Sequence, residues 1–194
     1  MDIYLEKKKK CIYAEIGIDK GITVLRRCEK LNTGSEIHLF DLNHKVKNVS
    51  DEVKSKYGDK FIVREFGVIK GDYNWDLMKI INEKESLKYD YVYLDGAHTL
   101  TIDGLAFVLI DKLLNVGGFI EFDDYNWTIG KSPTCSPYPP VNNKKWLKNY
   151  TKEQIDTSHV KLIVDNLVKT NKRYKEIVPN RIYQKIIEDF FDSV

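Results

Sequence analysis

Three aspartates stand where two apolar runs of the chain end. Residues 91–94 (YVYL) stop at Asp95, and residues 119–122 (FIEF) stop at Asp123 and Asp124. β-Branched and aromatic residues favour strands, and in open α/β sheets ligands bind outside the carboxyl ends of the strands. If the two runs are neighbouring parallel strands, the three carboxylates converge at one edge. Converging carboxylates suit either a hard cation or acid–base chemistry.

A helical segment between the two runs makes them neighbours. Its apolar residues recur at spacings of three and four, which predicts a helix; they are Leu105, Val108, Leu109 and Leu113. A strand, a crossover helix and a second strand form a βαβ unit, whose strands are parallel and close together in one sheet. We therefore expect an α/β fold with its site at the edge that carries Asp95.

A glycine-containing turn follows an earlier strand-like run, residues 11–17. The pattern is Glu15-x-Gly17-x-x-x-Gly21, followed by Thr23 and an apolar helical run. Glycine permits a tight turn and a close approach of the backbone to a ligand, and the start of the next helix offers free N–H groups. The pattern favours nucleotide-type binding, although an ordinary strand-to-helix turn would use the same residues.

Acidic residues also follow the next two strand-like runs. Residues 36–41 (EIHLFD) end in Asp41, and in nucleotide-binding α/β folds an acid at the end of the second strand binds the ribose hydroxyls. After the third run, the turn Gly71-Asp72-Tyr73 is placed to border an adenine ring. Asp41 could instead cap a turn, and Asp72 could cap the helix that follows.

The rest of the chain supplies a loop and a closing hairpin. Four of the five prolines lie in residues 125–143, which we expect to form an active-site loop. A capping box at Thr151 and Gln154 predicts the start of one further helix, and we expect His159, on or beside it, to be a surface or edge residue rather than a ligand. Strand-like runs on either side of residues 179–180 predict an antiparallel hairpin at the end of the sheet.

Composition indicates one soluble domain over residues 1–194. Charged residues make up 31% of the chain, and the net charge of +2 gives no bulk attraction to nucleic acid or to an anionic membrane. We find no signal peptide and no 18-residue apolar run. Three cysteines without metal-type spacing fit a reducing, cytoplasmic compartment. We therefore expect neither a nucleic-acid nor a membrane partner.

The order of these features resembles the class I S-adenosylmethionine-dependent methyltransferases. The most specific pieces are residues 89–98 (YDYVYLDGAH) and 115–125 (NVGGFIEFDDY). Within that class, the chain is most similar to metal-dependent O-methyltransferases of small molecules, including macrolide-sugar and rhamnosyl types. The resemblance covers residues 11–187 and implies a Rossmann-like, mostly parallel sheet closed by a C-terminal antiparallel hairpin.

The resemblance also implies roles for particular residues. Those assigned to S-adenosylmethionine are Glu15, Gly17, Gly21 and Thr23 for the methionine part and its turn, Asp41 for the ribose, and Asp72 and Tyr73 for the adenine. A divalent metal, with Mg²⁺ preferred, is assigned to Asp95, Asp123 and Asp124, and the general base to His98. Two positions depart from the pattern: Ala97 stands where many relatives carry an acid proposed as the base, and Asp19 stands where many methyltransferases have glycine.

The implied reaction is transfer of a methyl group to a hydroxyl of a sugar or glycan, by an enzyme that could form homo-oligomers. The Asp95-x-x-His98 pairing ranks sugar hydroxyls first. A catechol-type aromatic acceptor is an alternative, as is a non-catalytic methyltransferase-like binding module. A dinucleotide-dependent oxidoreductase is a further alternative, against which the missing middle glycine and the terminal hairpin argue.

Overall fold

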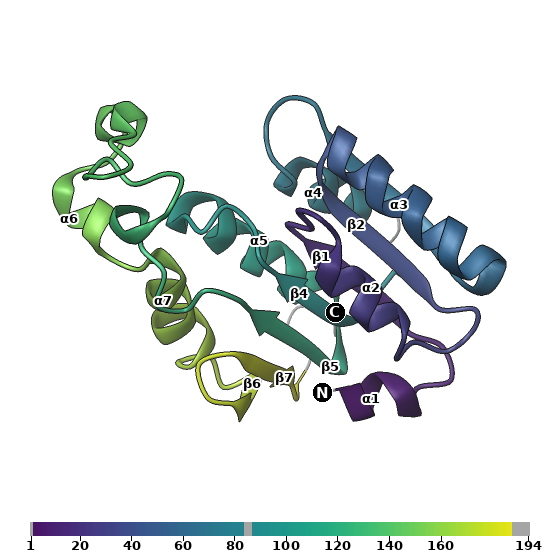
Figure 1. The fold of residues 1–194 in the computed structure, drawn as a ribbon. Helices are drawn as coiled ribbons and strands as arrows, with labels where there is room; N and C mark the ends of the chain where they lie inside the picture. The colour runs from purple at the N-terminus through teal and green to yellow at the C-terminus, as the bar shows by residue number, and fades with distance from the viewer. Residues whose placement is uncertain (1, 84–86, 188–194) are drawn as a thin grey trace.

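The computed structural model describes residues 2–83 and 87–187, which form a seven-stranded sheet covered on both faces (Figure 1). The strands are β1 (Ile12–Ile16), β2 (Glu36–Leu42), β3 (Ile62–Val68), β4 (Tyr89–Leu94), β5 (Leu114–Phe122), β6 (Tyr174–Val178) and β7 (Ile182–Lys185). Their order is β3-β2-β1-β4-β5-β7-β6. The pairings from β3 to β5 are parallel, whereas β7 pairs antiparallel with both β5 and β6. The predicted mostly parallel sheet with a closing hairpin is confirmed.

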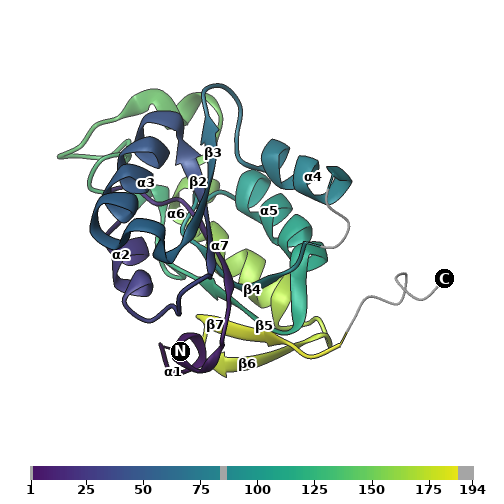
Figure 2. The same ribbon diagram turned by 90° about the vertical axis from the view of Figure 1, so that its right-hand side faces the viewer.

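Helices cover the two faces of the sheet (Figure 2). They are α1 (Asp2–Lys7), α2 (Ile22–Cys28), α3 (Asn43–Tyr57), α4 (Asn74–Glu83), α5 (Leu100–Leu113), α6 (Lys152–Asp156) and α7 (His159–Ile163), with the short turns η1 (Gly58–Lys60), η2 (Ile129–Lys131), η3 (Lys144–Lys148) and η4 (Val164–Val168). α2 and α3 pack on one face, where Val24 and Val46 are buried. α4, α5 and α7 pack on the other, where Leu77, Ile110 and Ile163 are buried. Each such side chain contributes about 1.5–3 kcal/mol by leaving water.

The sheet reverses its strand order between β1 and β4. From β1 the chain moves outward to β2 and β3, and it then returns to place β4 on the other side of β1. At such a reversal the connections leave in opposite directions, and a crevice opens outside the carboxyl ends of the two strands. The turns that follow β1 and β4 therefore meet at this crevice.

Helix α5 buries only two of the four apolar residues that predicted it, Leu109 and Leu113. Leu105 and Val108 are each 47% exposed, whereas Phe107 and Ile110 are buried. Because this helix is apolar on nearly every side, its neighbours α4 and α7 decide which face packs. A Cβ at Gly104 would lie 3.8 Å from Ile163 of α7, an ordinary van der Waals contact.

The helix predicted to follow Thr151 is divided in two. The capping box forms as predicted: the Thr151 hydroxyl accepts from the Gln154 N–H, and the Gln154 side chain accepts from the Thr151 N–H. Helix α6 nevertheless ends at Asp156, and the Ser158 hydroxyl caps α7 by accepting from the Lys161 N–H. A second cap within seven residues of the first explains the break.

Gly21 provides a test of how the turn between β1 and α2 packs against α3. Its φ is +74°, and an added Cβ would lie 2.7 Å from both methyl carbons of Val49 in α3. We expect Gly21→Ala to lower the free energy of unfolding by about 2–4 kcal/mol, from the left-handed backbone and the overlap together. Urea denaturation measures the change.

A matched control separates the two causes. Gly117 also has a positive φ, of +84°, but open space surrounds its Cβ position; Gly117→Ala should therefore cost only the backbone term, about 1–2 kcal/mol. Combining Gly21→Ala with Val49→Ala should cost less than the sum of the two single changes. Strict additivity would show that the overlap with Val49 is absent.

Candidate active site

A pocket of about 410 Å³ lies at the crevice outside the ends of β1 and β4. Small-molecule sites typically occupy about 300–1,000 Å³, so the pocket has the size that a nucleoside cofactor needs. The residues predicted from the sequence that line it are Gly17, Asp41, Asp72, Tyr73, Asp95 and His98. Asp19, the departure from the expected glycine, lines it as well.

Asp41 holds the turn after β1 in place. Its Oδ2 accepts hydrogen bonds from the backbone N–H groups of Ile18, at 2.9 Å, and Asp19, at 3.0 Å. The Lys45 ammonium lies 3.2 Å from the Asp19 carboxylate and 3.5 Å from that of Asp41. Asp41 therefore caps a turn and faces the pocket at once, so the two interpretations of this residue are compatible.

Asp72 also combines the two roles that the sequence allowed. Its Oδ1 accepts from the Asn74 N–H at 2.9 Å, which caps the start of α4, and the residue lines the pocket. Tyr73 lines the pocket with its ring, but its hydroxyl points inward to the Asp103 carboxylate. The ring is 7% exposed, so its position is fixed by packing before any ligand binds.

Three residues predicted to bind the cofactor lie outside the pocket lining. Gly21 packs against Val49, as described above, and Thr23 is half-buried on α2. Glu15 is 1% exposed and accepts a hydrogen bond from the Tyr13 hydroxyl within the core. Alternate residues of a strand face opposite sides of the sheet, and Glu15 shares the side of Tyr13, which faces the α2–α3 layer.

Asp103 organises the turn that follows β4, although the sequence analysis did not identify it. Its carboxylate is 2% exposed and accepts from the Ala97 N–H at 3.1 Å, the His98 N–H at 2.8 Å and the Tyr73 hydroxyl. Burial raises the pKa of Asp103, and these hydrogen bonds oppose that rise. An acid in the first turn of a mostly apolar helix, four residues after Thr99, was the signal that could have identified it.

His98 projects from this turn toward the carboxylates. Its backbone φ is +54°, an uncommon conformation that the bonds to Asp103 stabilise. The ring Nε2 lies 2.9 Å from Asp95 Oδ1 and 3.7 Å from Asp124 Oδ2, and the ring centroid lies 5.0 Å from that of Trp127. Burial alone would lower the pKa of His98, but the hydrogen bond and negative charge of Asp95, with the nearby aspartates, raise it overall.

Among the residues that the structure describes, Asp95, His98 and Asp124 form a cluster able to hold a metal ion: one ligand atom from each lies within 4.8 Å of the others. Burial raises the pKa of Asp124; the charge of His98 lowers it, while the charges of Asp123 and Asp95 raise it further. A cation would relieve this crowding of negative charge. Asp123 lies outside the cluster, with its oxygens directed at Tyr93 and Arg181.

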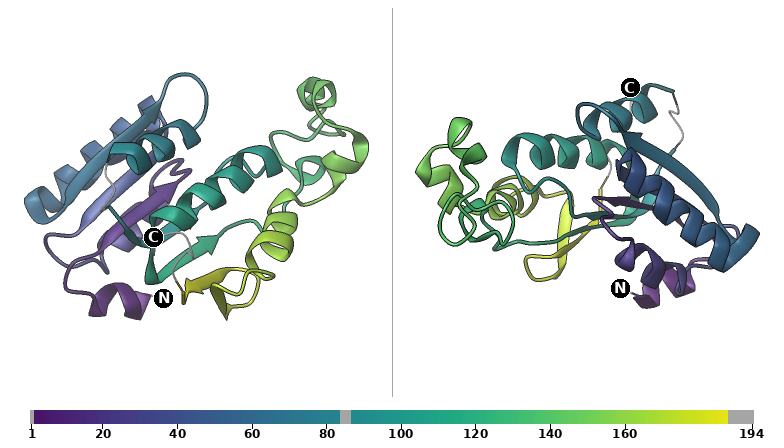
Figure 3. Two further views of the ribbon diagram at one scale, coloured as in Figure 1. Left: turned by 180° about the vertical axis from the view of Figure 1, so that it is seen from behind. Right: turned by 45° about the horizontal axis from the view of Figure 1, so that its top comes forward.

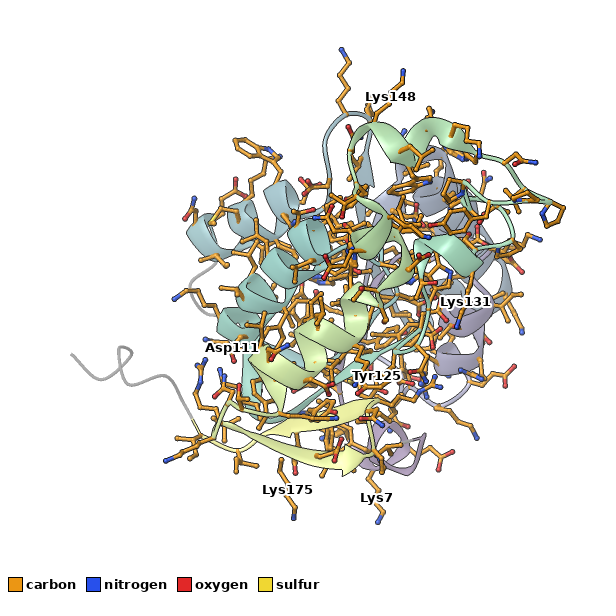
Figure 4. The ribbon with its side chains drawn as sticks, turned by 90° about the vertical axis from the view of Figure 1, so that its left-hand side faces the viewer. Lys7, Asp111, Tyr125, Lys131, Lys148 and Lys175 are labelled. Atoms are coloured by element: carbon orange, nitrogen blue, oxygen red, sulfur yellow. The ribbon has the colours of Figure 1, made fainter. Side chains whose placement is uncertain are left out.

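The segment of residues 125–143 is a loop, as predicted, with one short turn (η2), and it forms a wall beside the site. It projects beyond the sheet on the side of α5 (Figure 3), and Lys148 of the following turn lies at its outer end (Figure 4). The Ser158 hydroxyl donates to the Tyr125 carbonyl at 2.6 Å, which ties the base of the segment to α7. Its Trp127 ring reaches His98, so the wall borders the carboxylate cluster.

His159 is buried, at 5% exposure, and not at the surface or an edge as predicted. Its Nδ1 accepts from the Leu100 N–H at 3.1 Å, and its Nε2 donates to the Gln154 carbonyl at 2.8 Å. The two bonds define a neutral ring that fastens the start of α5 to α6. The residue therefore stabilises the element that carries the His98 turn.

Comparisons with known proteins identify the family and the fold. A family profile described as "Methyltransferase domain" matches residues 14–125, more than half of the chain. No curated protein shows a significant match. In the described residues 2–83 and 87–187, no helix is long and apolar enough to cross a membrane.

Solved structures with the same fold include several methyltransferases. An O-methyltransferase from Bacillus cereus, in complex with S-adenosylhomocysteine, is 14% identical with a TM-score of 0.62; the match covers 96% of this chain and 78% of that one. TomG, an O-methyltransferase of tomaymycin synthesis from Streptomyces achromogenes, in complex with S-adenosylmethionine, is 10% identical with a TM-score of 0.60; the match covers 94% and 75%. At these identities the likeness establishes the fold.

The buried bonds of Asp103 give a stability test of the His98 turn. Asp103→Asn keeps the size of the side chain but turns one acceptor oxygen into a donor, which then faces the N–H group of either Ala97 or His98, because these two groups donate to different oxygens. We expect the free energy of unfolding to fall by about 1–3 kcal/mol. Asp76→Asn, at a half-buried position of α4 where the carboxylate pairs with the exposed Lys79, should change it by less than about 0.5 kcal/mol. Equal effects in denaturant melts would contradict the assigned role.

Glu15 gives a pH test. Burial raises its pKa to about 8, against an ordinary value of 4.5, with the Tyr13 hydrogen bond acting in the opposite direction. The folded protein therefore holds this proton more tightly than the unfolded chain, and its contribution to stability is lost as pH rises from about 4.5 to 8. Glu15→Gln should remove this loss, so its advantage over the wild type should grow across that range. Glu52→Gln, on the exposed face of α3, should give no pH-dependent difference.

Proposed function

Because this chain belongs to the methyltransferase-domain family that matches residues 14–125, we propose that it transfers a methyl group from S-adenosylmethionine to a hydroxyl of a sugar or glycan. The observation that carries the proposal is the meeting of the pocket and the metal-competent cluster at one edge. Asp95 and His98 belong to both. A cofactor in the pocket would thus present its methyl group beside groups able to activate a hydroxyl.

The pocket has the features that the cofactor requires. Asp41 and Asp72 offer carboxylate oxygens that can accept from ribose or amine donors, and both line the cavity. Gly71, at the rim, has open space at its Cβ position and a φ of +86°, so the backbone itself borders the cavity. Two related folds hold S-adenosylhomocysteine or S-adenosylmethionine in their solved structures.

A divalent cation fits the cluster of Asp95, His98 and Asp124. The carboxylates of Asp95 and Asp124 offer the oxygen ligands that Mg²⁺ and Mn²⁺ prefer, and His98 stays beside the ion as the candidate base. When bound, such a cation would lower the pKa of an acceptor hydroxyl and orient its oxygen. The sequence prediction of Asp123 as a third carboxylate ligand is taken up in the next subsection.

The protein's own contribution to the reaction centres on His98. A sugar hydroxyl is a poor nucleophile, and its proton must leave as its oxygen attacks the methyl carbon and the carbon–sulfur bond breaks. Asp95 fixes the orientation of the His98 ring and raises its pKa, so the neutral ring is a strong acceptor for that proton. Asp103 contributes indirectly, because it holds the backbone from which His98 projects.

A catechol-type aromatic acceptor is the second candidate. The Trp127 ring lies beside His98 and could stack on a sugar face or on an aromatic ring. The non-catalytic alternative predicts cofactor binding without turnover. The sugar and catechol candidates both predict a small-molecule or glycan acceptor, and they differ in what is methylated.

A methyl-transfer screen distinguishes these candidates. Purified protein is incubated with S-adenosylmethionine labelled in the methyl group and with sugar, glycan and catechol acceptors, with and without EDTA. We expect transfer to a sugar hydroxyl that EDTA abolishes and added Mg²⁺ or Mn²⁺ restores. His98→Ala should reduce turnover by about 10²–10⁴-fold, whereas His44→Ala, on the exposed face of α3, should leave it unchanged.

Calorimetry with S-adenosylhomocysteine accompanies the screen. Binding without transfer to any acceptor would support the non-catalytic module, and transfer to catechols alone would support the aromatic alternative. Turnover that is indifferent to EDTA would contradict the metal-assisted reaction, and a loss below tenfold in His98→Ala would assign that residue to structure.

A further inference from the structure

We propose that Tyr93 and Arg181 are positioning residues that hold Asp123 away from the neighbouring cluster, so that a cation there is bound by Asp95 and Asp124 without Asp123. The inference rests on the proposed metal-assisted function, and it departs from the ligand set predicted from the sequence. It assigns a role to two residues that the reaction itself does not use.

Both oxygens of the Asp123 carboxylate already have partners. The Tyr93 hydroxyl donates to Oδ2 at 2.7 Å, and the Arg181 guanidinium lies 3.9 Å from Oδ1. Tyr93 is 3% exposed, so its hydroxyl cannot exchange this partner for bulk water without local opening. A buried hydroxyl that loses its acceptor costs about 1–3 kcal/mol, which favours leaving Asp123 where it is.

Arg181 is itself held by the core. Its Nε donates to Glu121 Oε1 at 2.7 Å, and its carbonyl accepts from the Phe122 N–H at 2.8 Å. Glu121 is 2% exposed and is also bound by Arg27 at 2.7 Å. The guanidinium therefore stands at a fixed place beside Asp123, and the closing hairpin brings it there.

The backbone explains why the two consecutive aspartates diverge. Asp123 continues the parallel ladder, its N–H donating to the Leu94 carbonyl at 3.1 Å. Asp124 then adopts a φ of +54°, which turns its carboxylate toward His98. Adjacent residues leaving a strand point to opposite sides, so the structure directs one carboxylate into the cluster and the other to Tyr93.

Manganese binding to the whole chain, measured by calorimetry, tests the proposal without requiring turnover. Asp124→Asn should weaken Mn²⁺ binding about tenfold or more, because it removes a ligand charge, whereas Asp123→Asn should change it less than about threefold. Tyr93→Phe should tighten binding several-fold, because it frees the Asp123 carboxylate to turn toward the ion. The tightening should disappear in the double variant Tyr93→Phe with Asp123→Asn.

Tyr91→Phe is the matched control. Tyr91 is as deeply buried as Tyr93 and lies on the same side of the same strand, but its hydroxyl donates to Glu121. It should leave Mn²⁺ binding unchanged. Circular dichroism melts confirm that each variant is folded. The test uses no Arg181 variant, because replacing Arg181 would also remove a donor from the buried Glu121.

Two results would overturn the proposal while leaving the metal site intact: an equal loss in Asp123→Asn and Asp124→Asn, or weaker binding in Tyr93→Phe. The latter would mean that Tyr93 orients Asp123 as a ligand. A wild-type protein that binds S-adenosylhomocysteine but no Mn²⁺ would instead reject the metal-assisted function, and the proposal with it.

Discussion

The site depends on how closely the chain passes at the ends of β1 and β4. A Cβ at Gly17 would overlap the carbonyl oxygen of Asp95, so glycine is required at this crossing. The Asp95 N–H donates to the Ile16 carbonyl, and the Gly17 N–H donates to that of Phe40, both at 2.8 Å. These bonds extend the sheet beyond its strands. They join the turn after β1, which begins at Gly17, to the turn after β4, which begins at Asp95.

Two buried carboxylates, Asp103 and Glu121, position the side chains of the site. Asp103 determines the conformation of the His98 turn, and Glu121 fixes the guanidinium that stands beside Asp123. Burying a charge is costly unless hydrogen bonds compensate it, and each of these two acids has at least two donors. Removing Asp103 would therefore disturb the His98 ring through the His98 backbone, and removing Glu121 would disturb Asp123 through Arg181.

The sequence was sufficient for features that depend on neighbours along the chain. The strands themselves, the glycine turn, the acids at strand ends and the capping box follow from local spacing, and the structure agrees with each. Other features depend on partners far apart in sequence. Glu15 lies in the core because the α2–α3 layer covers its side of the sheet, Asp103 reaches back to Tyr73, and Arg181 comes from the hairpin to meet Asp123.

The helical region after the wall segment shows the same limit. The sequence predicted one helix, with His159 at the surface or an edge. In the structure a second cap, Ser158, divides the helix, and the buried His159 bonds the start of α5. Spacing cannot reveal a bond to a backbone group on another element. The face of α5 was also undetermined, because its apolar residues are distributed on nearly all sides and only the packing of α4 and α7 selects among them.

The central claim is that cofactor and cation occupy two adjoining parts of one site. The most direct measurement is the ¹³C resonance of the methyl group of bound, ¹³C-methyl-labelled S-adenosylmethionine, recorded as Mn²⁺ is added. A paramagnetic ion at Asp95 and Asp124 should broaden that resonance strongly, and a diamagnetic Mg²⁺ control should not. A methyl resonance that keeps its width, with both cofactor and Mn²⁺ shown to be bound, would contradict the account.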